Sequence, residues 1–93
     1  MNKNEKGKAV LVTTEFKGVF FGYLEGRSEN SVTLKNARNC IYWPAANNGF
    51  LGLANMGPLA GSKIGPRADI ELMKPTCIAD ATPESVELWE EFK

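Results

Sequence analysis

Alternating apolar and polar positions predict a chain built mainly from short β-strands. The alternation occurs in residues 8–14, 18–25, 31–35, 37–43, 68–73 and 76–79, and turn-forming residues separate these segments. In the second segment, Val19, Phe21 and Tyr23 fall on one face, and Gly22 suits a sharply bent strand. The first four segments follow one another through short connections. We therefore expect the first half to form an antiparallel meander, in which Asn36 separates the third strand from the fourth.

A helix is predicted over residues 83–92. Thr82 suits the N-cap and Pro83 the first helical position, and an acidic residue follows in the first turn. Val86 and Trp89 belong to one apolar stripe, whereas most of the glutamates lie on the other side. We expect this helix to cover one end of a small barrel. The alternative is that its Trp89 face docks a partner.

The segment 44–66 differs from the rest of the chain because it holds five of the nine glycines. Glycine lowers the propensity for regular structure, although residues 49–55 could form a short helical turn. A connection of this length in a small domain is usually functional or serves assembly. We predict a mainly β fold with a C-terminal helix: a small antiparallel SH3-like or Sm-like barrel that carries this glycine-rich insertion. Residues 8–93 would form the single domain, and residues 1–7 a flexible tail.

Length and hydropathy narrow the class of protein further. A chain of 93 residues buries only about 60 to 65% of its unfolded surface, so self-association is a plausible source of extra stability. No uncharged run approaches the roughly 20 residues that cross a bilayer, and the polar start lacks a signal-type apolar segment. We expect a cytoplasmic homo-oligomer without membrane contact.

The composition weighs against catalysis. The chain has no histidine, which removes the commonest general base and the commonest partner of a serine or cysteine nucleophile. Its two cysteines, Cys40 and Cys77, cannot complete a zinc site alone, and each lies in an apolar stretch that suits a small buried residue. No nucleotide-loop motif is present. We expect a non-enzymatic protein with no cofactor and no metal.

Charge is balanced overall but unevenly distributed. Residues 30–68 carry four basic and no acidic side chains, whereas residues 69–93 carry two basic and seven acidic ones. The four cations, Lys35, Arg38, Lys63 and Arg67, could form a compact anion site; the alternative is a solvated rim with chance segregation of charge. Long polynucleotides usually require a larger basic surface, so a small phosphorylated ligand fits better.

Aromatic and amide side chains occur in the same acid-free stretch. Tyr42 and Trp43 end a predicted strand and offer stacking surfaces, and asparagines nearby offer paired hydrogen-bonding groups. These are the parts of a nucleobase pocket, with backbone amides of the glycines helping to hold phosphate. The candidate ligand-binding residues are Arg38, Trp43, Asn47, Asn48, Phe50, Asn55, Ser62, Lys63 and Arg67. The alternative for the apolar residues here is a role in the core or in a subunit interface.

Two resemblances extend this interpretation. Residues 8–43, with Gly-Tyr-Leu-Glu-Gly before Val-Thr-Leu-Lys-Asn-Ala, look like the first part of an Sm-like or other SH3-like small barrel. The segments 18–26, 33–38, 40–43, 49–54 and 57–66 resemble a family of small phage and prophage proteins. That resemblance implies interference with host defence, nucleic-acid binding or virion assembly.

The leading hypothesis from the sequence is an oligomeric sponge that sequesters a nucleotide immune signal of the cyclic oligonucleotide or cyclic ADP-ribose type. Such a sponge needs preorganised binding sites and no catalytic residue. In it, Arg38, Lys63 and Arg67 would contact phosphate and Trp43 or Phe50 would stack on a base. The alternatives are a protein-interaction module and a binder of single-stranded nucleic acid.

Overall fold

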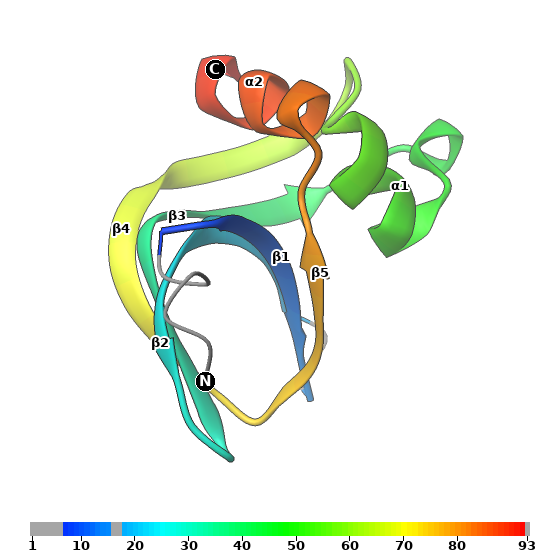
Figure 1. Cartoon of the computed structure of the whole chain (residues 1–93). Helices are drawn as coiled ribbons and strands as arrows, with labels where there is room; N and C mark the ends of the chain where they lie inside the picture. Colours follow the sequence, from blue (N-terminus) through cyan, green and yellow to red (C-terminus); the bar gives the residue numbers. More distant parts are fainter. Residues whose placement is uncertain (1–6, 16–17, 93) are drawn as a thin grey trace.

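Five antiparallel strands form one curved sheet in the order β4-β3-β2-β1-β5 in the computed structural model, which describes residues 7–15 and 18–92 (Figure 1). The strands are β1 (Ala9–Thr14), β2 (Val19–Arg27), β3 (Ser31–Tyr42), β4 (Lys63–Met73) and β5 (Pro75–Asp80). The helices are the 3-10 helix η2 (Ala45–Asn47), α1 (Gly49–Met56) and α2 (Pro83–Glu91). The predicted mainly β fold with a C-terminal helix is therefore confirmed, and the barrel class remains a prediction. The expected tail lies outside the described residues, except for Gly7.

The sheet is curled so far that its two edges meet at one end. β4 and β5 lie at opposite edges, yet Lys74 alone connects them along the chain. The Lys74 N–H donates to the Asn30 carbonyl at 2.8 Å, and the Lys74 carbonyl accepts from the Glu15 N–H at 3.2 Å. Lys74 adopts a left-handed φ of 54°, which turns the chain sharply from one edge strand into the other. At the opposite end of the sheet, α1 and α2 lie over the strands (Figure 1).

The third and fourth predicted strands are one continuous strand, β3, so the predicted break at Asn36 is wrong. Asn36 instead takes a left-handed φ of 50° within the strand, where the pairing with β4 shifts between Leu34 and Ala37. The Asn36 N–H donates to the Asp69 carboxylate at 2.9 Å, which replaces the ladder bond lost at this bulge. β4 also begins five residues earlier than predicted, at Lys63, and extends the β3–β4 ribbon.

Both faces of the sheet are packed. Leu11, Val19 and Phe21 join buried residues of α1 and α2 in one cluster, and Tyr23 packs against it. The opposite face holds Val10, Val12, Leu24, Val32, Leu34 and Ala37. Partly buried apolar side chains of both edge strands pack on this second cluster, so the curled sheet encloses it. The predicted alternation along β2 is confirmed.

The C-terminal helix begins where predicted and covers the first cluster. The Ser85 N–H donates to Thr82 Oγ1 at 3.1 Å, which confirms the N-cap, and the helix ends one residue before the predicted end. Trp89 is fully buried and stacks on Phe21 with 5.2 Å between ring centroids. The alternative in which the Trp89 face docks a partner is therefore wrong. Within the described residues, no helix is long and apolar enough to span a membrane.

Candidate functional site

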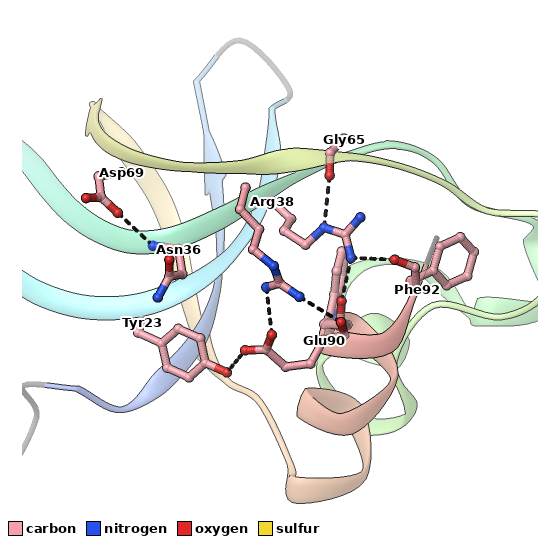
Figure 2. Close-up of polar contacts among 9 residues, drawn as sticks. Tyr23, Asn36, Arg38, Gly65, Asp69, Glu90 and Phe92 are labelled. Atoms are coloured by element: carbon pink, nitrogen blue, oxygen red, sulfur yellow. Dashed lines mark hydrogen bonds and ion pairs between the residues drawn. The ribbon is translucent and has the colours of Figure 1, made fainter.

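Arg38, the first predicted phosphate ligand, points into the protein. Its side chain is on β3 with only 8% of the residue exposed. Nε donates to the Gly65 carbonyl at 2.9 Å, and Nη1 donates to the Trp89 and Phe92 carbonyls at 2.7 Å each (Figure 2). Burial, followed by the charge of Arg67, lowers the pKa of Arg38 from its ordinary value. Arg38 therefore joins the sheet to the end of α2.

Arg67, on β4, is paired directly with Arg38 on β3, and its side chain also contacts α2. Its Nη1 contacts Glu90 Oε1 at 2.6 Å, and its Nη2 donates to the Glu90 carbonyl at 2.7 Å. The Tyr23 hydroxyl donates to the other Glu90 carboxylate oxygen, and burial together with Glu90 raises the pKa of Tyr23 to about 12 (Figure 2). The sheet thus brings the two arginines together, as predicted, but around the helix end.

The sequence holds a signal for this role of the arginines. A helix C-terminus carries a partial negative charge and favours cations, yet the last turn of α2 has Glu90 and Glu91 and no basic residue. Arg38 and Arg67 supply the missing positive charge and the donors for the last carbonyls from the neighbouring sheet. The acidic last turn of α2 could therefore have indicated, from the sequence alone, that cations from elsewhere in the chain pack against this helix end.

The three predicted ligand asparagines have separate environments. Asn47 is fully buried: Nδ2 donates to the Gly57 carbonyl at 2.8 Å, and Oδ1 accepts from the Leu59 N–H at 3.2 Å. This amide fixes the chain on both sides of α1, so its role is structural. Asn48 is exposed with a left-handed φ of 61°, and Asn55 is exposed on α1. Only these two present amide groups at the surface.

The predicted stacking residues are partly enclosed. Trp43 and Phe50 are half-buried and pack against the cluster beneath the helices. Ser62 is 8% exposed, and its Oγ has no hydrogen-bond partner among the described residues. Of the two neighbouring aromatics at the end of β3, Tyr42 is the accessible one, with 52% of the residue exposed. The sequence indicates Tyr42 with Trp43 as a stacking surface, but the candidate ligand residues include only Trp43.

Tyr42 and Lys63 form the most open candidate site in the acid-free stretch. They are paired across β3 and β4, and both are exposed. Lys63 makes no ion pair with any described residue. Gly61, with a φ of 98°, turns the exposed chain into β4 just before this lysine. A planar ring and an unpaired ammonium group side by side can stack on a base and neutralise a phosphate.

The described residues offer little for covalent or metal chemistry. Burial raises the pKa of the Cys40 thiol to about 11, so the thiolate nucleophile is scarce at neutral pH. Cys77 is exposed on β5, remote in the sheet order from β4. No group of three histidine, cysteine or carboxylate side chains in residues 7–15 and 18–92 could hold a metal ion.

Two surface cavities lie away from the predicted ligand residues. One, of about 540 Å³, is lined by Ala81 and by residues of α2; the other, of about 430 Å³, lies near the β1–β2 turn and the end of β4. Neither includes any of the nine candidate residues. Tyr42 and Lys63 are both exposed and line neither of these two cavities.

Comparison with known proteins gives one match. Residues 7–89 match a family model described as a domain of unknown function, DUF6948. No curated protein and no solved structure matches the chain. The match spans nearly all of the described fold, including Arg38, Arg67 and the Tyr42–Lys63 pair, and ends just before Glu90.

Proposed function

The chain belongs to the DUF6948 family, and we propose that it is a non-enzymatic protein that binds a small phosphorylated nucleotide at the Tyr42–Lys63 pair. The proposed ligand class is a cyclic oligonucleotide or a cyclic ADP-ribose-type signal. Binding would sequester this signal and so counter a host defence that depends on it. The resemblance to phage proteins supports this context, and sequestration requires affinity without turnover.

The pairing of Tyr42 with Lys63 is the observation that carries this proposal. The register holds the main chain of the exposed tyrosine and the exposed lysine on adjacent strands, so the two residues are neighbours before a ligand arrives. No acidic side chain occurs between residues 30 and 68, which leaves the Lys63 charge uncompensated along this stretch. A phosphate beside Lys63 with its base on Tyr42 would use both groups at once.

The contacts of Arg38 and Arg67 change the proposed ligand contacts. Arg38 donates its hydrogen bonds to main-chain carbonyls, and Arg67 forms an ion pair with Glu90. Both side chains are therefore engaged within the protein. The proposed site therefore consists of Tyr42 and Lys63, with the amide of Asn48 as a further exposed group on the same connection. The open shape of this surface fits a ligand enclosed between two copies of the chain.

Native mass spectrometry tests the proposal. The purified protein is measured alone and with cyclic dinucleotides, cyclic trinucleotides, cyclic ADP-ribose isomers and a short oligonucleotide. Lys63→Ala and Tyr42→Ala are measured beside Lys35→Ala, a matched control that removes a β3 cation paired with Asp69 at 3.4 Å. We expect one small nucleotide per site, and an affinity loss of about tenfold or more in the first two variants only.

Failure of every small nucleotide to bind would overturn the proposal. Equal losses in Lys63→Ala and Lys35→Ala would also overturn it, because the effect would then be one of general charge. Affinity that rises with oligonucleotide length and falls steeply with salt would instead support a single-stranded nucleic-acid binder.

A protein-interaction module is the second candidate, favoured by exposed apolar side chains on β3 and on α1. Ile41 is 63% exposed and Leu51 is 62% exposed, whereas large aliphatic side chains are most often buried. Such side chains are typical of the centre of a protein interface. Capture of a specific protein that is lost in Leu51→Asp and kept in Lys63→Ala would select this function over nucleotide binding.

A further inference from the structure

We propose that the surface cavity beside the first turns of α2 binds a small aliphatic diamine or polyamine. The cavity, of about 540 Å³, lies where the chain passes from β5 into α2 (Figure 1). Its lining consists of Ala81, Pro83, Glu84, Val86 and Glu87. The proposal is independent of nucleotide binding, because the cavity shares no residue with the Tyr42–Lys63 pair.

The cavity has a fixed apolar floor. Ala81 and Val86 are partly buried and pack against the cluster beneath the helices. The Ala81 N–H donates to the Ala9 carbonyl at 3.0 Å, and the Val86 N–H donates to the Thr82 carbonyl at 2.9 Å. Both residues are therefore held in place before a ligand arrives, which lowers the entropic cost of binding. A preformed apolar cavity with a few polar groups is typical of a small-molecule site.

Two carboxylates of the cavity lining have no partner within residues 7–15 and 18–92. Glu84 and Glu87 are exposed, and neither side chain forms an ion pair or a hydrogen bond with a described residue. Neither carboxylate caps the helix, because Thr82 accepts the Ser85 N–H in that role. Both negative charges are therefore available to a cationic ligand.

The apolar floor and the two carboxylates together select the class of ligand. Residues three positions apart on a helix have Cβ atoms about 5–6 Å apart, so the carboxylates of Glu84 and Glu87 can face two ammonium groups joined by a short methylene chain. The methylene groups would cover the apolar floor, and the ammonium groups would stay in contact with the carboxylates and with water. An inorganic divalent cation would leave the floor uncovered. Residues 69–93 carry seven acidic and two basic side chains, which favours the approach of a cation to this part of the surface.

Titration with putrescine, followed by ¹H–¹⁵N chemical shifts, tests the site. We expect saturable shifts at Ala81, Val86 and Glu87 at millimolar putrescine, and much smaller shifts at equimolar Mg²⁺, which has the same charge and no methylene chain. Glu84→Gln and Glu87→Gln should each weaken putrescine binding by about fivefold. Glu91→Gln is the matched control, because Glu91 is an exposed glutamate of the same helix that does not line the cavity. This control should leave the affinity unchanged.

Three results would overturn the proposal. The first is the absence of any saturable shift with putrescine. The second is an equal response to Mg²⁺, because the apolar floor would then contribute nothing. The third is an equal loss of affinity in Glu87→Gln and Glu91→Gln, because the effect would then be one of general charge on α2. Circular dichroism confirms that each variant is folded, and the nucleotide titration is a separate experiment, so either proposal can fail without the other.

Discussion

Burial decides what each cation of the acid-free stretch does. Composition singles out Arg38, Lys63 and Arg67 equally, but the sheet turns Arg38 inward, pairs Arg67 with Glu90 and leaves Lys63 open. Sequence alone could identify this stretch and could not divide these roles, because the division depends on where α2 packs. The same holds for Asn47, whose amide is buried between two main-chain groups.

Replacing Arg38 should destabilise the fold far more than replacing Arg67. Arg38→Met leaves three carbonyls without their charged donor, and we expect the free energy of unfolding to fall by about 2–4 kcal/mol. Arg67→Ala removes a partly exposed pair and should cost below about 1 kcal/mol. Urea unfolding of both variants measures the difference, and equal losses would contradict the structural role assigned to Arg38.

Stability should decline at alkaline pH through Tyr23 and Cys40. Both groups have a pKa above the ordinary value, about 12 for Tyr23 and about 11 for Cys40, so the folded state retains protons that the unfolded state releases. Their contribution is intact below the unfolded values near 9 and 10 and is lost as pH rises through 11 and 12. Tyr23→Phe should flatten this decline in urea midpoints measured from pH 8 to 12; an unchanged decline would exclude Tyr23.

At the scale of elements, local patterns predicted most of the strands and the final helix. The alternation along β2 and the Thr82 cap depend only on residues that are close in sequence, and the structure confirms both. The bulge at Asn36 was not predictable, because its lost ladder bond is replaced by Asp69 from a strand 33 positions away. The glycine-rich segment forms the eight-residue α1, longer than the short turn expected, and Gly52 there packs tightly beneath the Asn47 carbonyl.

The N-cap of α2 should have a measurable effect because Thr82 serves two elements. Its Oγ1 accepts from the Ser85 N–H and donates to the Asn55 carbonyl of α1 at 2.6 Å. Thr82→Ala should lower the free energy of unfolding by about 1–2 kcal/mol, since both bonds are lost. Thr82→Ser keeps the hydroxyl and should recover most of this loss. Equal melting temperatures for the two variants would show that the hydroxyl contributes nothing.

At the scale of the whole molecule, the single-residue link at Lys74 imposes the curl of the sheet. A single residue can connect the two edge strands, β4 and β5, only if the sheet bends until the end of β4 lies beside the start of β5. The order of strands was not fixed by alternation, which predicts strands and not their partners. The curl leaves α1 and α2 over one face and the Tyr42–Lys63 pair at the end of the β3–β4 ribbon.

The most direct measurement of the central claim is a ¹H–¹⁵N chemical-shift map of the protein during titration with the nucleotide that native mass spectrometry retains. We expect saturable shifts concentrated at Tyr42, Lys63 and the chain around Gly61. Small or absent shifts are expected at Lys35 and along β5, apart from any change in oligomeric state. Shifts that cluster elsewhere, with Tyr42 and Lys63 unchanged at saturation, would contradict the proposed site.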